Sequence, residues 1–208
     1  MQQCKGVAQG LVRSLEDPLN EGRVQVEFPW LPNEADWPWA PVAVSLSGGA
    51  RGMQFMPEQG DEVLVAFEQG HCDHPFIVGF LWNGGALPPE TGTTTNRVIL
   101  TPGGHTLRFE DGGSTADGSS ADANNDDKKI VLRTNGGHQV HMNDDSADQT
   151  VSITSSGGHE IKLDDSGAKI SVVSSGGLSM TLDDNASSIK LEGGGRSLTL
   201  ASGKVTIG

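Results

Sequence analysis

The stretch GGHEIKLDDSGAKISVVSS, residues 157–175, decides the fold of the C-terminal half of the chain. Apolar residues alternate with polar ones twice in it, first at Ile161 and Leu163 and then at Ile170 and Val172. A period of two predicts β-strands with one apolar and one polar face. The Asp-Asp-Ser-Gly segment between the two runs is typical of a turn. The stretch therefore predicts two strands joined by a turn, each with one apolar face.

The same pattern recurs along the C-terminal half, aligned on pairs of glycines. The repeats read GGHTLRFED (103–111), GGHQVHMNDD (136–145), GGHEIKLDD (157–165), GGLSMTLDD (176–184) and GGRSLTLAS (194–202). A second alternating strand follows each of them. The apolar positions form a predicted core: Leu107, Phe109, Ile130, Leu132, Val140, Met142, Val151, Ile153, Ile161, Leu163, Ile170, Val172, Met180, Leu182, Ile189, Leu191, Leu198 and Leu200.

Each strand offers only two or three apolar residues on one face, which is too few for a strand pair to fold unaided. Either a single-chain β-solenoid or three chains wound around a common core could complete the burial. A repeat of two strands is met more easily when other chains supply the neighbouring walls, so we expect a trimeric β-helix. About eleven strands at ~4.7 Å each would make a rod on the order of 50 Å long.

The N-terminal half differs in composition, since all four Trp and five of the six Phe lie before residue 83. Five short apolar or alternating runs are separated by Gly, Pro and Asn signals, which predicts a small closed all-β barrel, with an OB-type barrel as the natural expectation. The predicted strands are 6–14, 22–28, 40–46, 62–68 and 75–81. The predicted organisation is an N-terminal OB-fold domain over 1–85, a linker over 86–96 and a β-helix shaft over 97–208 with a surface loop at 112–127.

The charge of the chain limits its partners. The 208 residues carry a formal net charge of -13, so nucleic acid is not an expected partner. An OB barrel can bind oligonucleotides, but Arg13, Arg23 and Arg51 are few against the surrounding acids. No apolar run approaches the length of a membrane span and no signal segment opens the chain, so we expect synthesis in the cytosol. In that compartment Cys4 and Cys72 are expected to be free thiols.

The possible ligand residues favour structural roles. His105, His138 and His159 follow successive glycine pairs, but Leu178 and Arg196 replace them in later repeats. The cluster from His71 to His74 lies in a predicted hairpin loop without a distant ligand pair. The glycine and aspartate pairs suggest calcium-binding repeats, but the GGxGxDxUx pattern is absent. No nucleophile, base and oxyanion set can be assembled. We therefore expect no metal, no cofactor and no catalysis.

The N-terminal half resembles a known family through several ordered motifs. They are Gly22-Arg23-Val24-Gln25-Val26, Phe28-Pro29-Trp30, Trp39-Ala40-Pro41-Val42, Phe55 with Pro57, Gly60 through Phe67, and Pro75 through Gly84. Over roughly residues 6–85 they resemble the OB domain of the phage baseplate assembly protein V and type VI VgrG-type spike family of contractile injection systems. The shaft is similar in kind but not in its exact repeat.

The resemblance implies a homotrimeric spike with a triple-stranded β-helix, made in the bacterial cytoplasm and carried by a phage tail or injection particle. It implies a baseplate hub protein at the OB end, a PAAR-like tip protein at the far end, and transient contact with a target membrane. The C-terminal residues that would meet the tip protein are Val205, Thr206, Ile207 and Gly208. The sequence contains neither a hub nor a lysozyme domain, so both activities are expected on other proteins. The alternative is a monomeric calcium-binding β-solenoid or adhesin.

Overall fold

The protein is all-β, as the sequence predicts. The computed structural model describes residues 4–31, 36–91, 95–112, 128–201 and 203–208. In these ranges the only helical element is the 3₁₀ turn Glu68–Gly70, and no helix is long and apolar enough to cross a membrane. The chain divides into two compact units, Met1–Pro88 and Pro89–Gly208.

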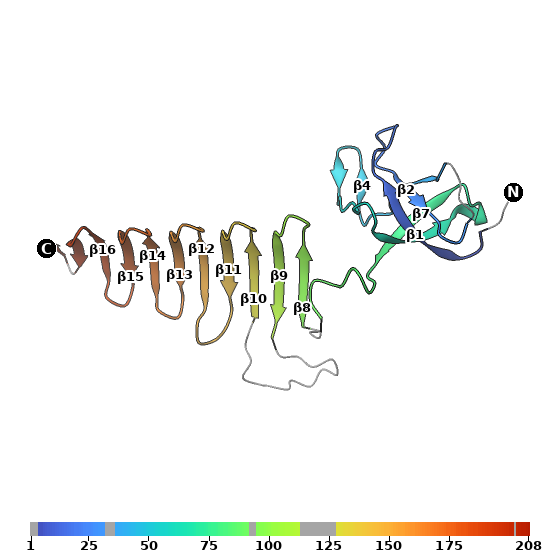
Figure 1. Ribbon diagram of the computed structural model, residues 1–208. Helices are drawn as coiled ribbons and strands as arrows, with labels where there is room; N and C mark the ends of the chain where they lie inside the picture. The colour runs from blue at the N-terminus through green and yellow to red at the C-terminus, as the bar shows by residue number, and fades with distance from the viewer. Residues whose placement is uncertain (1–3, 32–35, 92–94, 113–127, 202) are drawn as a thin grey trace. The chain divides into compact units, whose positions relative to one another are not determined.

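The N-terminal unit is built on a five-stranded antiparallel sheet (Figure 1). The strand order is β3-β2-β1-β6-β7. A two-stranded hairpin lies in the connection between β3 and β6. The strands of this unit are β1 (Val7–Ser14), β2 (Val24–Glu27), β3 (Trp39–Ala40), β4 (Ser47–Gly48), β5 (Arg51–Gly52), β6 (Glu62–Phe67) and β7 (Pro75–Leu81).

A short parallel contact joins the two ends of this sheet. Val42, just after β3, pairs with Ile77 of β7. The Ile77 amide donates to the Pro41 carbonyl at 3.0 Å, and the Ala43 amide donates to the Ile77 carbonyl at 2.8 Å. The sheet therefore closes into a barrel. The predicted strand 40–46 is wrong in its length, because the ladder with β2 ends at Ala40 and the residues that follow pair with β7 at Val42 only.

The barrel core is small and apolar. Alternate residues of β2 and β6 point inward, and Phe28 packs against Trp37 and Phe67 with ring centroids 6.4 Å and 5.5 Å away. A side chain at Gly10 would place its Cβ 2.3 Å from Val26 Cγ1, so this position of β1 requires glycine. The buried core residues, each at most 2% exposed, are Val12, Val24, Val26, Phe28, Ala40, Val63, Val65 and Ile77.

The expectation of free cysteines is wrong, because Cys4 and Cys72 form a disulfide. β1 runs antiparallel to β6 with Val7 opposite Ala66, so the residues before β1 meet the loop after β6. The Cys4 amide donates to the Gly70 carbonyl at 2.9 Å in the same place. This pairing brings the two Cα atoms within 5.2 Å, a proximity that the expected reducing compartment does not reveal.

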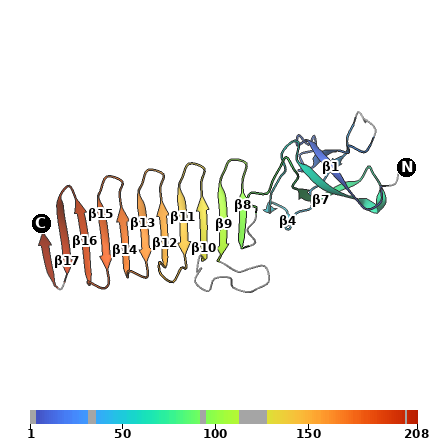
Figure 2. The same cartoon turned by 60° about the horizontal axis from the view of Figure 1, so that its bottom comes forward.

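The C-terminal unit is one antiparallel sheet of eleven strands that follow one another in sequence order (Figure 1). Figure 2 shows the strands as a row joined by hairpins on alternate sides. The chain thus forms a meander rather than a solenoid that coils on itself. The strands are β8 (Asn96–Leu100), β9 (Thr106–Asp111), β10 (Lys128–Arg133), β11 (Gln139–Asn143), β12 (Thr150–Thr154), β13 (Glu160–Asp164), β14 (Lys169–Val173), β15 (Ser179–Asp183), β16 (Ser188–Gly193), β17 (Arg196–Ala201) and β18 (Lys204–Ile207).

Glycine turns repeat along one side of this sheet. In the turn after β10, the Gly137 amide donates to the Thr134 carbonyl at 3.0 Å, and the His138 amide donates to Thr134 Oγ1 at 3.0 Å. Gly137 has a φ of 90°, a conformation that side chains other than glycine rarely adopt. The predicted surface loop 112–127 lies, beyond Gly112, outside the described residues.

Candidate interaction surface

The predicted core positions of the C-terminal half lie side by side in two rows across one face of the sheet. Each strand contributes one residue to each row, and cross-strand pairing connects every residue to the next. The first row is Ile99, Leu107, Leu132, Val140, Ile153, Ile161, Val172, Met180, Leu191, Leu198 and Ile207. The second row is Arg97, Phe109, Ile130, Met142, Val151, Leu163, Ile170, Leu182, Ile189, Leu200 and Val205. We call these the two apolar rows.

One chain leaves the apolar rows uncovered. Ile161, Leu163 and Ile170 are each 43% exposed, whereas the polar Lys162 and Ser171 on the opposite face are half-buried. This is the reverse of the usual distribution in a folded domain. A continuous exposed apolar strip of this length marks an interaction surface.

The opposite face is polar and carries ion pairs between neighbouring side chains. Lys162 lies 3.6 Å from Asp164, Lys169 lies 3.1 Å from Asp183, and Lys190 lies 2.7 Å from Glu192. The hydrogen bond from the backbone N–H of Ala186 is the largest cause that holds the pKa of the Asp183 carboxyl below its usual value. The hydrogen bond from the Lys169 side chain is the second cause. Such exposed pairs contribute little to stability, but they suit a face that remains in water.

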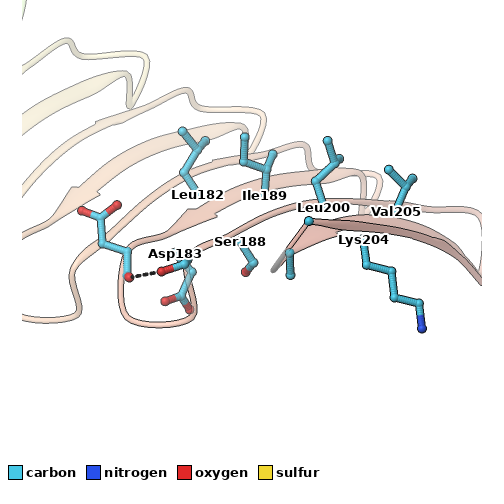
Figure 3. Close-up of a pocket in the computed structure, with 11 residues that line it drawn as sticks. Leu182, Asp183, Ser188, Ile189, Leu200, Lys204 and Val205 are labelled. Carbon is cyan, nitrogen blue, oxygen red and sulfur yellow. Dashed lines mark hydrogen bonds between the residues drawn. The ribbon is translucent and has the colours of Figure 1, made fainter.

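A shallow hollow lies across β15 to β18, close to the C-terminal end. Figure 3 shows Leu182, Ile189, Leu200 and Val205 pointing to one side of the sheet, while Asp183, Ser188 and Lys204 point to the other. The apolar and the polar residues that line this hollow therefore lie on opposite faces of the sheet. Val205 and Ile207 are 61% and 81% exposed, so the predicted tip surface is apolar and bare.

The three repeated histidines connect successive glycine turns. Nδ1 of His105 accepts the backbone N–H of Asn135, Nδ1 of His138 accepts that of Ser156, and Nδ1 of His159 accepts that of Ser175, each at 3.3 Å. Each imidazole therefore binds the turn two strands further along. The shared place of these histidines after successive glycine pairs was a signal for this link, but it was interpreted only as equivalence of position. No cluster of three possible metal ligands occurs in the described part of the chain.

In the predicted loop from His71 to His74, two of the possible ligand side chains already have partners. Cys72 is in the disulfide, and His74 Nδ1 lies 3.4 Å from a Glu68 carboxylate oxygen. Two of the three arginines that were considered for nucleic-acid binding have acidic neighbours in the barrel. Arg23 pairs with Asp17 at 2.7 Å, and Arg13 lies 3.6 Å from Glu27.

The outer face of β7 was missed from the sequence. Phe76, Val78 and Phe80 alternate with inward-facing residues and are 38–48% exposed, and Trp82 beyond them is 71% exposed. The run PFIVGFL was predicted only as a strand of the barrel, yet it is apolar on both faces. A strand that is apolar on both faces is usually buried on both faces.

Comparison with known proteins identifies the N-terminal unit. Residues 8–82 match the family described as the type VI secretion system/phage-baseplate injector OB domain. The barrel therefore matches an injector OB domain, which confirms the OB prediction. The resemblance to spike proteins of contractile injection systems is confirmed with it.

Curated relatives are similar over the same region. The chain is 35% identical over 103 residues to the type VI secretion system spike protein VgrG3 of Vibrio cholerae, which covers 44% of this chain and 10% of that protein. It is 35% identical over 72 residues to spike protein VgrG2a of Pseudomonas aeruginosa, covering 33% and 9%. The actin cross-linking toxin VgrG1 of Vibrio cholerae is 34% identical over 101 residues, covering 43% and 9%. The chain matches about a tenth of the length of these relatives.

Proposed function

We propose that the protein is the structural central spike of a contractile injection machine, in which three copies bury their apolar rows against one another. The observation that carries this proposal is the pair of apolar rows, which run the length of the C-terminal sheet and are exposed in one chain. Similarity to type VI secretion spike proteins supports the same function.

Burial of the apolar rows supplies the driving force for assembly. Covering the remaining exposed surface of one leucine-sized side chain contributes roughly 1 kcal/mol. Over all strands of three chains the gross gain is on the order of tens of kcal/mol, before the entropy of association is subtracted. A strip only two side chains wide suits one wall of a narrow triangular core, which favours three chains over two packed face to face.

The two ends of the shaft would bind different partners. β18 is the last strand of the sheet, with an unpaired backbone edge and the exposed side chains of Val205 and Ile207. Such an edge needs a cover, which supports a PAAR-like tip protein there. On the OB domain, the apolar outer face of β7 supports attachment to a baseplate hub protein.

A closed trimeric shaft would transmit compressive load along its length. Between its end strands every strand of the sheet is paired on both sides, so load passes through continuous hydrogen-bonded ladders. On sheath contraction the spike would be driven as one rigid body through the target membrane. Its role is mechanical, without catalysis, and it would be delivered to the target envelope as part of the particle.

The turn aspartates support this function over calcium binding. The Gly167 amide donates to Asp164 Oδ1 at 2.6 Å, and the Ala186 amide donates to Asp183 Oδ1 at 2.8 Å. These carboxylates thus satisfy backbone N–H groups of their own turns, as Asx residues commonly do. The calcium-binding solenoid also requires a coil, whereas the described strands form a meander.

Binding of a purified PAAR-type tip protein to the immobilised full chain tests the proposed contact at the C-terminal end of the shaft. Ile207→Asp places a charge on the exposed apolar end, so we expect binding to weaken at least tenfold. Ser171→Asp, on the polar face and away from the end, is the matched control and should bind as the unaltered chain does. Equal capture by the Ile207 variant and the control would contradict the tip assignment.

A further inference from the structure

Arg97 is the one charged side chain in the two apolar rows of the described strands. It stands opposite Phe109 in the ladder between β8 and β9, and it is the first residue of the second row. At the equivalent place in the first row, Ile99 stands opposite Leu107. The position is thus part of the same face, although the residue type differs from every other member of the rows.

The guanidinium of Arg97 is held in a defined place. Its Nη1 donates to the carbonyl oxygen of Thr95 at 3.0 Å and pairs with the Asp111 carboxylate. Asp111 lies two residues beyond Phe109 on β9, so its side chain is on the same face as the apolar rows. Both side chains are more than half exposed in one chain, at 65% for Arg97 and 56% for Asp111. Assembly on this face would remove water from both.

The apolar rows alone do not specify how three chains align along the shaft. Beyond β9 each pair of strands presents nearly the same apolar side chains as the pair before it. A slip of one chain by two strands, roughly 9.5 Å, would place apolar residues on apolar residues again. Uniform patterns of this kind specify register weakly. A single polar layer in an otherwise apolar core can set register, as a buried polar residue does in coiled coils.

We propose that the Arg97–Asp111 pair sets the axial register of the three chains, an inference that rests on the proposed trimer. In the aligned trimer the three pairs lie at one level, at the first strand of the shaft, and share the remaining water. In a slipped trimer each pair would face the apolar rows of a neighbour. That arrangement leaves guanidinium and carboxylate groups desolvated without additional partners, which is unfavourable.

Distance measurement between identical spin labels tests this inference. A nitroxide attached at Lys204→Cys, on the polar face of β18, reports the separation of the three chains near the far end. Cys4 and Cys72 are joined to each other, so the label attaches at the introduced thiol. The otherwise unaltered chain should give one narrow distance by pulsed EPR. Arg97→Leu/Asp111→Asn, which leaves the row uncharged, should add a second, longer distance.

Two further variants make the result decisive. Arg133→Leu removes an exposed arginine from the polar face and should keep the single narrow distance. The charge swap Arg97→Asp/Asp111→Arg retains a pair at the same level and should also keep it, which covers the case in which the uncharged variant does not fold. A single unchanged distance in the uncharged variant, or a loss of register in the charge swap, would overturn the inference while the trimer stands. A monomeric mass for every variant would instead contradict the proposed function.

Discussion

The disulfide between Cys4 and Cys72 connects the start of the OB domain to the loop after β6. Because the two residues lie far apart in the sequence, the bond strongly restricts the unfolded chain. The disulfide closes a loop with a separation of 68 residues. In the chain-entropy account, a loop of this length contributes about 4 kcal/mol to stability. We therefore expect Cys4→Ser/Cys72→Ser to lower the free energy of unfolding of the OB domain by about that amount.

Chemical denaturation followed by tryptophan fluorescence measures this change, because the four tryptophans lie in the N-terminal half. A reductant should lower the unfolding midpoint of the unaltered protein to that of the variant, and it should leave the variant unchanged. If the reductant does not shift the midpoint of the unaltered protein, the disulfide does not stabilise this domain.

Asp17 is the most strongly held carboxylate among the described residues. It receives hydrogen bonds from the Arg23 guanidinium, with Nη2 at 2.7 Å, and from the backbone N–H groups of Leu19, Glu21 and Arg23. The Arg23 side chain is the largest cause that holds the pKa of Asp17 far below its usual value. The group therefore stabilises the fold above its unfolded pKa of roughly 4, and this contribution is lost as the pH falls through the folded value.

We expect Asp17→Asn to lower the thermal unfolding midpoint of the OB domain at pH 7. The difference from the unaltered protein should shrink as the pH falls below about 4, because the carboxylate is then increasingly protonated in the unfolded chain while it stays ionised in the folded one. Glu16→Gln, next to it in the chain, serves as the control and should behave as the unaltered protein at every pH. A constant difference between pH 7 and pH 2 would show that the ionised carboxylate is not the cause.

At the scale of the element, each strand of the C-terminal sheet has one face for water and one for a partner. Ile170 and Ser171 are neighbours on β14 and point to opposite faces. Ile170→Asp would place three carboxylates in the trimer core, where unpaired charges are strongly unfavourable. We expect this variant to be monomeric at micromolar concentration, whereas Ser171→Asp should keep the native mass.

Analytical ultracentrifugation of the two variants measures the effect, with circular dichroism to compare their β-sheet content. The same mass for both variants would show that the face carrying Ile170 is not an interface.

The sequence was sufficient to predict the strands β9 to β18 and which of their residues share a face, but it did not predict β8. Alternation with a period of two determines the face, and the repeated glycine pairs determine where the chain turns. Arg97 was not recognised as a member of the rows, because β8 is preceded by no glycine pair and did not enter the repeat alignment. The length of β3 was predicted wrongly because the apolar run continues beyond Ala40, where the hydrogen-bonded ladder with β2 ends.

At the scale of the whole molecule, what the sequence could not show depends on pairing between distant segments. The disulfide follows from the antiparallel pairing of β1 with β6, and the barrel closes through a single parallel contact at Val42 and Ile77. Neither contact leaves a periodic signal in the sequence. The apolar outer face of β7 was missed for a related reason, since an apolar run alone does not show how many of its faces are covered within one chain.

In the proposed spike, three copies of this chain bury the apolar rows together. Light scattering coupled to size-exclusion chromatography, with and without a calcium chelator, tests it most directly. We expect three times the chain mass of 21.8 kDa in both conditions, because the driving force is apolar burial and not a bound cation. A folded species of 21.8 kDa that unfolds when the chelator is added would contradict the trimeric spike.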